Sequence, residues 1–423
     1  MKVVIMAGGK GTRIAAINAE VPKPMIEICG KPILEHQINC LKQQGLTEII
    51  LIIGHLGHVI ETYFGDGSSF GVKIEYIREN EPLGTAGALY YLKDKITEDF
   101  LLINGDIIFS VNIDKFMRAH KKSGGLVTIL THPNSHPYDS GVIITGENGQ
   151  VSRWMTKEEE RMWYKNCVNA GLHMISPVLL GRFLEPIKTD LDRDVLKPLI
   201  NEGMLFAYDS PEYVKDMGTP ERYYAVAQDI ENGLVQRKNL LEKQKAIFLD
   251  RDGTINKYVG FLTDISQMEL LDGVADAIGK INQSGYLAIV VTNQPVVARG
   301  EVTYDELKEI HNKMETLLGE KGVYVDDIFY CPHHPHKGYE GEIPELKIEC
   351  ECRKPKSGML YEAAKKYNID LQQSWMVGDG KNDIEAGKSA GCKTVLLSRE
   401  DVDYGQELSA IDLNTAIDNI LAK

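Results

Sequence analysis

The chain has 423 residues, of which 43% are hydrophobic and 26% charged, a globular composition with enough apolar residues for two or three domains. Its 61 acidic and 47 basic residues give a formal net charge of −14, which argues against nucleic-acid binding because duplex affinity comes largely from phosphate neutralisation. No apolar run approaches the roughly 18 residues that span a membrane, and the N-terminal apolar stretch stops at Gly8, too early for a secretory signal. We expect a cytoplasmic protein that binds small molecules rather than nucleic acid or membrane. The sequence leaves its oligomeric state open.

Short apolar segments predict two cycles of strand and helix along the chain. The first cycle has a helix over Ile33–Gln44 and strands over Val3–Met6, Glu48–Ile53, Lys73–Ile77, Phe100–Ile103 and Leu126–Leu130. The second cycle has strands over Lys245–Asp250, Tyr286–Val291, Asp326–Tyr330, Gln373–Val377 and Thr394–Leu397. All-apolar strands alternating with helices are typical of largely parallel α/β sheets.

A glycine-poor segment over Thr219–Gln244 separates the two cycles. Its Thr219-Pro220 start predicts a helix, because threonine is a good N-cap and proline suits the first helical position. We therefore predict a first domain over residues 1–232, a helical linker over 233–244 and a second domain over 245–423.

A glycine-rich loop, Gly8–Arg13, follows the first predicted strand, where glycines let backbone N–H groups approach a phosphate closely. The loop lacks the Walker pattern, and Ile14 stands where a dinucleotide fingerprint requires glycine or alanine. Alone it would be a simple strand-to-helix turn. Arg13 and Lys23, which lies between two prolines, add cations just downstream and favour a phosphate-binding loop.

The first half resembles the sugar-nucleotidyltransferases, which join a sugar 1-phosphate to a nucleoside triphosphate. The resemblance covers residues 1 to about 230 and is carried by Gly8–Arg13, Lys23-Pro24, Gly84–Gly87, Asn104–Asp106, Asn169–Gly171 and Asp216–Thr219. It implies a Rossmann-like domain with a GT-A-like mixed sheet. It also implies roles for substrate-binding Gly8, Gly9, Gly11, Gly84 and Asn169, for catalytic Arg13 and Lys23, and for Asp106 and Asp216 as Mg²⁺ ligands.

One motif departs from that family. Its frequent Glu-Lys-Pro is replaced here by Met155-Thr156-Lys157-Glu158, and Lys157 is the candidate for the sugar-phosphate contact. The implied charges suit the chemistry, because an anionic nucleophile must reach an anionic phosphorus and the site has to neutralise both.

In the second half, Asp250 and Asp252 directly follow a predicted strand. Such a pair can divide the work of phosphoryl transfer, one carboxylate attacking phosphorus and the other moving protons, although Asp-x-Asp-Gly also favours a plain turn. Thr292-Asn293 and Gly378-Asp379 follow other predicted strands, and Arg353-Lys354 supplies cations. Because sites in open α/β sheets gather at the carboxyl ends of strands, these residues predict one site.

Residues 245 to about 400 resemble the haloacid-dehalogenase phosphatase superfamily, which implies a second Rossmann-like domain with a parallel sheet. The resemblance implies that Asp250 is the nucleophile that forms an aspartyl-phosphate and that Asp252 is the general acid and base. Further implied roles are phosphoryl stabilisation by Thr292 and Lys354, substrate contacts by Asn293 and Arg353, and Mg²⁺ binding by Asp250, the Asp252 carbonyl and Asp379.

Cys331-Pro332-His333 and Cys350-Glu351-Cys352 form two compact pairs of soft ligands. Three cysteines and one histidine predict a tetrahedral zinc site, which is structural because all four positions are filled by protein. His334 and His336 are competing ligands.

Zinc-loop members of this superfamily include D,D-heptose 1,7-bisphosphate phosphatases and histidinol phosphatases. Asp250–Asn256 and Cys352–Pro355 look most like the heptose enzyme, although Phe261 replaces its usual tyrosine and Pro295-Val296 replaces small polar residues. A heptose bisphosphatase yields the sugar 1-phosphate that a nucleotidyltransferase consumes. In bacterial heptose pathways that resemble this arrangement, the α-anomer is activated with guanosine. We therefore predict a bifunctional enzyme that acts on phosphorylated heptose and an NTP, with guanylyl transfer from GTP to the α-anomer.

Three alternatives remain open. The transferase can use UTP or CTP with another sugar 1-phosphate, or the phosphatase can act on histidinol phosphate. A non-enzymatic sensor in one half is disfavoured, because neither half lacks its charged groups.

Overall fold

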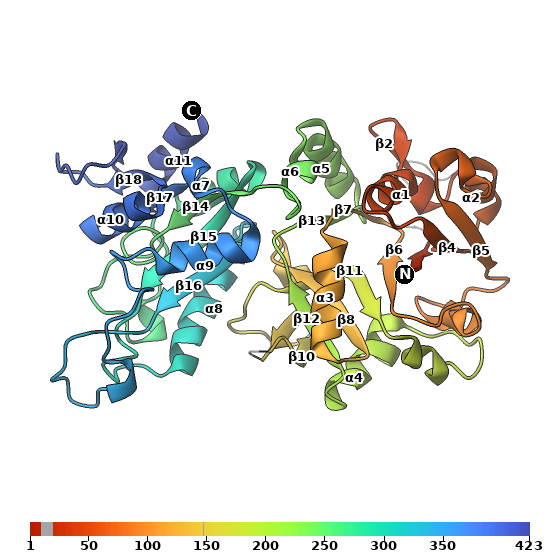
Figure 1. The fold of residues 1–423 in the computed structure, drawn as a ribbon, viewed down its shortest axis with the longest axis horizontal. Helices are drawn as coiled ribbons and strands as arrows, with labels where there is room; N and C mark the ends of the chain where they lie inside the picture. The colour runs from red at the N-terminus through yellow and green to blue at the C-terminus, as the bar shows by residue number, and fades with distance from the viewer. Residues whose placement is uncertain (10–19, 147) are drawn as a thin grey trace. The chain divides into compact units, whose positions relative to one another are not determined.

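The computed structural model describes residues 1–9, 20–146 and 148–423, and their contacts divide into two compact units (Figure 1). The first unit contains residues 1–132, 143–155 and 169–239, and the second contains 133–142, 156–168 and 240–423. The main division, after residue 239, falls inside the predicted linker. The two short segments 133–142 and 156–168 differ from the prediction of an uninterrupted first domain.

The first unit is built on a mixed sheet, which has nine strands within the described residues. The strands are β1 (Val3–Met6), β4 (Glu48–Ile53), β5 (Lys73–Arg78), β6 (Phe100–Asn104), β8 (Val127–His132), β9 (Val142–Thr145), β10 (Val151–Met155), β11 (Val168–Ile175) and β12 (Leu205–Asp209). Their order is β10-β9-β11-β6-β1-β4-β5, with β8 beside β11 and β12 beside β8. β4, β5 and β6 run parallel to β1, whereas β11 is antiparallel to β6, so the sheet is mixed as expected.

The helices of the first unit bury apolar stripes, most of them against this sheet and the two C-terminal ones against a small ladder of two strands. They are α1 (Ile33–Gln43), α2 (Gly57–Phe64), α3 (Ile113–Ser123), α4 (Lys197–Asn201), α5 (Pro220–Glu231) and α6 (Leu234–Arg237). Leu34 and Ile38, one turn apart on α1, share a core cluster with Ile5 of β1. Two small ladders, β2 (Glu27–Ile28) with β3 (Lys31–Pro32) and β7 (Ile107–Ser110) with β13 (Tyr213–Asp216), complete the unit. The predicted N-cap is confirmed, because the Thr219 side chain accepts the N–H of Arg222.

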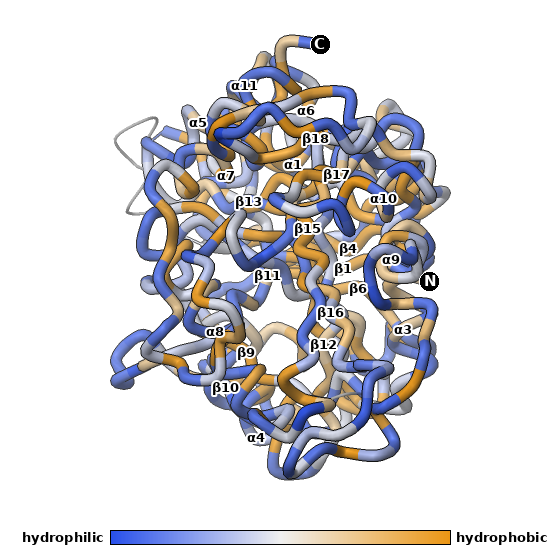
Figure 2. The backbone as a smooth tube through the Cα atoms, turned by 90° about the vertical axis from the view of Figure 1, so that its left-hand side faces the viewer, coloured by the Kyte–Doolittle hydropathy of each residue, from blue (hydrophilic) through white to orange (hydrophobic). Residues whose placement is uncertain are grey.

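The second unit contains a parallel sheet in the order β16-β15-β14-β17-β18-β19. Its strands are β14 (Lys245–Leu249), β15 (Tyr286–Asn293), β16 (Asp327–Cys331), β17 (Trp375–Gly378), β18 (Lys393–Leu397) and β19 (Leu408–Ala410). Along β14, Ile247 and Leu249 belong to one core cluster and Ala246 and Phe248 to another, so both faces of the sheet are buried. Hydrophobic residues, orange in Figure 2, concentrate in such central strands.

Five helices, counted over the described residues, cover the two faces of this sheet. They are α7 (Val274–Gln283), α8 (Tyr304–Glu320), α9 (Gly358–Tyr367), α10 (Lys381–Ala390) and α11 (Leu413–Leu421). Apolar residues of α7, α8 and α11 join the cluster of Ile247, and those of α9 join the cluster of Phe248. Across the part of the chain that the structure describes, no helix is both long and apolar enough to cross a bilayer.

The segment 156–168 packs on α8 through buried polar contacts, and Asn166 in turn exchanges hydrogen bonds with Asn134 of the segment 133–142. The Thr316 hydroxyl accepts the N–H of Tyr164 at 3.0 Å, and the Glu315 carboxylate accepts the N–H of Asn166 at 2.8 Å. Thr316 and Glu315 are only 3% and 7% exposed, so these hydrogen bonds satisfy groups that water does not reach. The polar face of α8 is therefore covered by chain that lies some 150 residues earlier.

We predict that Thr316→Val destabilises the second unit, because it leaves the buried N–H of Tyr164 without an acceptor. Such a loss costs about 1–3 kcal/mol. Urea denaturation followed by tryptophan fluorescence measures the effect. Thr316→Ser, which keeps the hydroxyl, is the control and should lose much less. An unchanged urea midpoint for Thr316→Val would show that the 156–168 segment does not depend on this contact.

Candidate active sites

A cavity of about 750 Å³ in the first unit lies at the carboxyl ends of four parallel strands. Gly8, Gly54, Glu79 and Gly105 line it, each just beyond the end of β1, β4, β5 or β6. Ligands of open α/β sheets bind at this edge. Five predicted site residues line the same cavity, namely Gly8, Gly9, Lys23, Gly84 and Asp106.

Both carboxylates predicted to bind Mg²⁺ in this unit have a cationic partner. Lys23 Nζ lies 2.5 Å from Asp106 Oδ2, and Arg222 Nη1 lies 2.9 Å from Asp216 Oδ2. The β7–β13 ladder brings the two aspartates close in the fold, because the N–H of Met217 donates to the Asp106 carbonyl at 3.0 Å. Oxygen ligands on adjacent strands, with basic groups beside them, fit a site for a divalent cation and phosphates.

Two further predicted residues of the first half, Asn169 and Lys157, are not part of the described lining of this cavity. Gly11 and Arg13 lie outside the described residues. Asn169 accepts the N–H of Gly171 at 3.1 Å in a local turn, and Lys157 is exposed in a turn of the 156–168 segment. Neither is among the described lining residues, so their substrate contacts stay predictions.

Glu79 is a cavity residue that the sequence reasoning missed. Its carboxylate lies against Gly8, where any larger residue would place a Cβ on the Glu79 oxygen. Burial raises the pKa of Glu79, and the N–H of Leu83 donates to its Oε1 at 3.2 Å. Glu79 directly follows β5 as Gly105-Asp106 follows β6, and this position was the signal that could have identified it.

A second site lies at the carboxyl edge of the parallel sheet in the second unit. Asp250 directly follows β14, Asn293 ends β15 and Asp379 directly follows β17, which is the convergence that the sequence predicts. Lys354, 3% exposed, places Nζ 2.7 Å from Asp250 Oδ1 and 2.6 Å from Asp383 Oδ1. It also donates to the Val291 carbonyl at 2.8 Å, so all three of its N–H groups have an acceptor.

This site holds more negative than positive charge. Carboxylate oxygens of Asp250, Asp379 and Asp383 lie within 4.8 Å of one another. Burial raises the pKa of Asp250 to about 6 against the opposing effect of Lys354, and burial together with Asp250 raises that of Asp379 to about 6. Burial alone would lower the pKa of Lys354, but the two carboxylates beside it raise the value above normal. Three carboxylates around one ammonium fit a divalent cation, whose charge would restore the balance.

The predicted acid and base, Asp252, accepts hydrogen bonds from Arg251, Asn256 and Gln294. Gln294 also donates to the hydroxyl of Thr292, which is 1% exposed. The sequence reasoning assigned no role to Arg251 or Gln294, because neither residue type marks a phosphoryl-transfer site by itself.

Asn293 and Arg353 hold the loop that delivers Lys354. The Asn293 amide exchanges two hydrogen bonds with the Lys354 backbone, at 2.9 and 3.0 Å, and Arg353 Nη1 donates to the His333 carbonyl at 3.2 Å. Their contacts with a substrate stay predictions.

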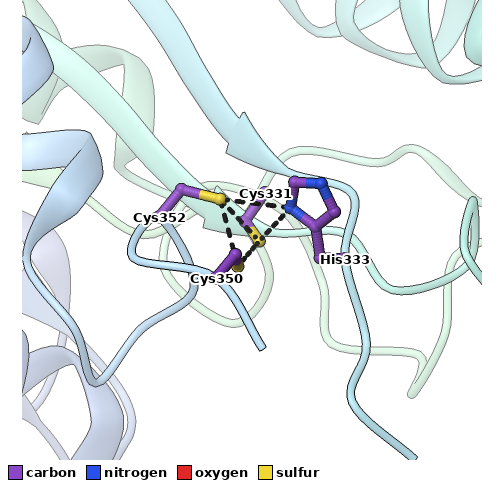
Figure 3. A group of neighbouring side chains, drawn as sticks. All are labelled: Cys331, His333, Cys350 and Cys352. Atoms are coloured by element: carbon purple, nitrogen blue, oxygen red, sulfur yellow. Dashed lines mark hydrogen bonds between the residues drawn. The ribbon is translucent and has the colours of Figure 1, made fainter. Parts of the chain in front are cut away.

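The four predicted soft ligands converge beside this loop (Figure 3). Cys352 Sγ lies 3.1 Å from Cys331 Sγ, 3.3 Å from Cys350 Sγ and 3.3 Å from His333 Nδ1. The sulfurs are too far apart for disulfides, and hydrogen bonding from Cys331 lowers the pKa of Cys352 to about 5. His334 instead binds the His336 carbonyl. Cys331, His333, Cys350 and Cys352 are thus a group that can hold a metal ion.

Comparison with known proteins finds separate matches for the N-terminal and the C-terminal parts of the chain. The model of the Nucleotidyl transferase family matches residues 2–233, and a HAD-hydrolase-like model matches residues 351–417. The mannose-1-phosphate guanylyltransferase catalytic subunit beta of Xenopus tropicalis is 32% identical over 229 residues, covering 53% of this chain. The chain spans only 62% of the length of that relative.

The C-terminal part is similar to the D-glycero-beta-D-manno-heptose-1,7-bisphosphate 7-phosphatase of Haemophilus influenzae. The two are 45% identical over 155 residues, which is 37% of this chain and 82% of the relative. Among solved structures, HddC from Yersinia pseudotuberculosis overlaps 54% of this chain and 99% of its own length, with 27% identity and a TM-score of 0.48.

We predict that Gly253→Ala disrupts the second site beyond the cost of backbone strain. Gly253 has φ +80°, and an added Cβ would collide with Asp379 Oδ2, displacing a carboxylate of the metal-binding group. Gly260→Ala is the control, because Gly260 has φ +81° and no atom within 4 Å of an added Cβ. Each alanine should lose about 1–2 kcal/mol from the left-handed backbone.

Hydrolysis of p-nitrophenyl phosphate, measured beside thermal unfolding, separates the two effects. Gly253→Ala should lose at least about tenfold in rate and Gly260→Ala little, since displacing a ligand weakens charge stabilisation at the reacting phosphorus. Equal rates for the two variants would mean that contact between residue 253 and Asp379 is immaterial.

Proposed function

We propose that this chain, which belongs to the Nucleotidyl transferase family and through its C-terminal part to the family of the Haemophilus heptose bisphosphate 7-phosphatase, catalyses two consecutive reactions on one sugar. The second unit removes the 7-phosphate of D-glycero-D-manno-heptose 1,7-bisphosphate. The first unit then transfers GMP from GTP to the heptose 1-phosphate and releases pyrophosphate. The observation that supports the proposal is that each unit has its own group of carboxylates and basic side chains near the carboxyl ends of its strands. We also propose that the enzyme acts in the cytoplasm.

In the phosphatase reaction, Asp250 attacks the phosphorus of the 7-phosphate and forms an aspartyl-phosphate. Lys354, held against Asp250, keeps the nucleophile ionised and neutralises charge on the transferring group. The Thr292 hydroxyl also stabilises the transferring phosphoryl group. Asp252 gives a proton to the leaving sugar oxygen. A Mg²⁺ ion held by Asp250, the Asp252 carbonyl and Asp379 would supply electrostatic stabilisation of the phosphoryl oxygens.

In the transferase reaction, the sugar phosphate attacks the α-phosphorus of the nucleotide, and both partners are anions. Lys23 is poised to neutralise them, and the glycine backbone at Gly8 and Gly9 lets phosphates approach closely. Asp106 and Asp216 would hold the Mg²⁺ that screens the triphosphate.

Glu79 favours guanine over the other bases. Guanine presents two adjacent donors, N1–H and the 2-amino group, and a carboxylate can accept both in a bidentate arrangement. Uracil has one ring N–H, and cytosine and adenine have one amino group beside an unprotonated ring nitrogen, so none of them offers this pair. The place of Glu79 beside Gly8 in the cavity therefore supports GTP rather than UTP or CTP.

The order of the two reactions follows from charge. A 7-phosphate adds about two negative charges to a sugar end that the transferase cavity otherwise meets as neutral hydroxyl groups. We therefore propose that dephosphorylation comes first and that the heptose 1-phosphate is the substrate of the first unit.

We predict that single carboxylates separate the two chemistries. Asp250→Asn should abolish phosphate release, and Asp106→Asn should abolish pyrophosphate release, each by about a thousandfold or more, because several kcal/mol of transition-state stabilisation is lost. Given heptose bisphosphate, GTP and Mg²⁺, the wild-type protein should form GDP-heptose. Asp250→Asn should form little from bisphosphate but convert supplied heptose 1-phosphate normally.

Mass spectrometry of the products, with each of the four NTPs and each anomer, is the measurement. Both anomers are needed because we favour the α-anomer, whereas the curated phosphatase relative is named for the β-anomer. A preference for UTP or CTP would overturn the guanylyl assignment, and much faster hydrolysis of histidinol phosphate would overturn the heptose assignment. Ordinary phosphate release by Asp250→Asn would contradict the covalent mechanism.

We further propose that Cys331, His333, Cys350 and Cys352 bind zinc. Three thiolates and one imidazole in a compact group are the donor set that Zn²⁺ prefers, and four protein ligands leave no position for a reactive water. The ion would therefore stiffen the loop that carries Arg353 and Lys354.

We predict about one zinc per chain in anaerobically purified protein, measured by elemental analysis. Cys350→Ser should lose the zinc, lower the thermal stability of the second unit and slow phosphate release, while nucleotidyl transfer stays nearly intact. Cys29→Ser, at an exposed cysteine of the first unit, is the control for cysteine loss and should keep the metal. Wild-type protein without stoichiometric zinc would refute the site.

A further inference from the structure

A fully buried guanidinium stands beside the general acid of the second unit. Arg251 is 0% exposed, and its Nη2 donates to both oxygens of Asp252, at 2.8 and 2.9 Å, while Nε lies 3.2 Å from Oδ1. A buried cation is costly unless it is paired and its N–H groups are satisfied. The geometry of Asp252 is therefore tied to that of Arg251.

His311 of α8 fixes the other end of that guanidinium. Its Nε2 lies 3.2 Å from Arg251 Nη1, and the ring is 6% exposed. Burial, with the adjacent Arg251 adding to it, lowers the pKa of His311 well below its usual value, so the imidazole is neutral. Because arginine can only donate, Nε2 must be the acceptor and the ring proton must sit on Nδ1.

Gln294 extends the same network to the phosphoryl-binding side. Its Oε1 accepts from Arg251 Nη2 at 3.0 Å, and its Nε2 donates to Asp252 Oδ2 and to Thr292 Oγ1, both at 2.9 Å. The donor-only guanidinium decides which way this amide faces, since a flipped amide would set N–H against N–H. One buried arginine thus orients both the Asp252 carboxylate and the Gln294 amide, which links Asp252 to Thr292.

We propose that Arg251 and His311 are positioning residues that aim the Asp252 carboxyl at the leaving oxygen of the phosphate ester. The inference rests on the proposed phosphatase activity and concerns one step of it. As the Asp250 oxygen bonds to phosphorus and the P–O bond to the sugar breaks, the Asp252 proton passes to the sugar oxygen. Water then attacks the aspartyl-phosphate, gives its proton to Asp252 and releases phosphate, which returns both carboxyl groups to their starting state.

Substrates with different leaving groups distinguish a positioning role of Arg251 and His311 from a purely structural one. A sugar alkoxide is a strong base and needs the proton to depart, whereas p-nitrophenolate departs readily without it. The ratio kcat/KM covers every step up to loss of the leaving group. A displaced Asp252 therefore slows the sugar ester selectively, whereas partial unfolding slows both substrates by the same factor.

The experiment compares three full-length variants on heptose 1,7-bisphosphate and p-nitrophenyl phosphate, with Mg²⁺. His311→Leu removes the acceptor and should lower kcat/KM for the heptose ester at least about tenfold but for the aryl ester by less than about twofold. His311→Gln can present an amide oxygen near the place of Nε2 and should recover most of the heptose rate. Met314→Ala, in the apolar core one turn along α8, should lower thermal stability without changing the ratio between the substrates.

Two results would overturn the inference: an equal loss on both substrates in His311→Leu, or no loss on either. Failure of His311→Gln to recover more than His311→Leu would also count against an acceptor role. Asp252→Asn should show the same selectivity, and combining it with His311→Leu should add little further loss. The proposed function is tested separately by the wild-type turnover of the bisphosphate, so the two can fail independently.

Discussion

The second site depends on the ion pairs that the buried Lys354 ammonium makes with Asp250 and Asp383. A buried lysine remains charged only where acceptors surround it, and here two carboxylates and a strand carbonyl take its three N–H groups. Those acceptors come from the ends of β14 and β15 and from the start of α10. The loop that delivers Lys354 is tied in turn to Asn293 and, through Arg353, to the cysteine and histidine group. Two strand ends, a helix start and the loop that carries Lys354 thus together stabilise one buried positive charge.

Both units follow the same electrostatic rule, although their sheets differ. The carboxylates that we propose as metal ligands lie beside basic side chains, Asp106 beside Lys23 in the first unit and Asp250 beside Lys354 in the second. In the absence of substrate such pairs lower the cost of gathering like charges. When a phosphate and a divalent cation bind together, the phosphate can pair with the basic side chain and the cation with the carboxylate. The total charge of the site then changes little. The pairs therefore leave each site ready for a doubly charged ligand and its metal.

Sequence reasoning worked where chemistry is local to a strand end. All ten predicted strands occur, within one or two residues at their ends, because continuous apolar runs of five or so residues have few other ways to be buried. Asp250, Asn293 and Asp379 converge because parallel neighbours end at the same edge of a sheet. The cysteine and histidine group was equally predictable, since two ligands spaced by one residue leave only one loop closure to be made. Strands β9 to β11 were not predicted. β9 and β10 are short and partly exposed, and β11, although buried, contains Asn169 and Gly171, which are unfavourable in strands.

What remained hidden was contact between distant segments through polar groups. Nothing in residues 156–168 marks them as part of the second unit, because their backbone N–H groups are bound by side chains of a helix 150 residues later. In the sequence, Arg251 is simply the residue between two aspartates, and His311 is one of several histidines and lies in an amphipathic helix. Their pairing depends on how far α8 lies from β14, and Glu79 becomes a cavity residue only once β5 lies beside β4.

The sequence by itself determined which residues are candidates for the chemistry and at which end of which strand they lie, because apolar periodicity and motif spacing are properties of short stretches of chain. The tertiary structure decided which cation faces which carboxylate, which histidine nitrogen must accept and which segments share a core. Those outcomes depend on the excluded volume and buried polar balance of the whole packed unit, and no local window of sequence contains that information.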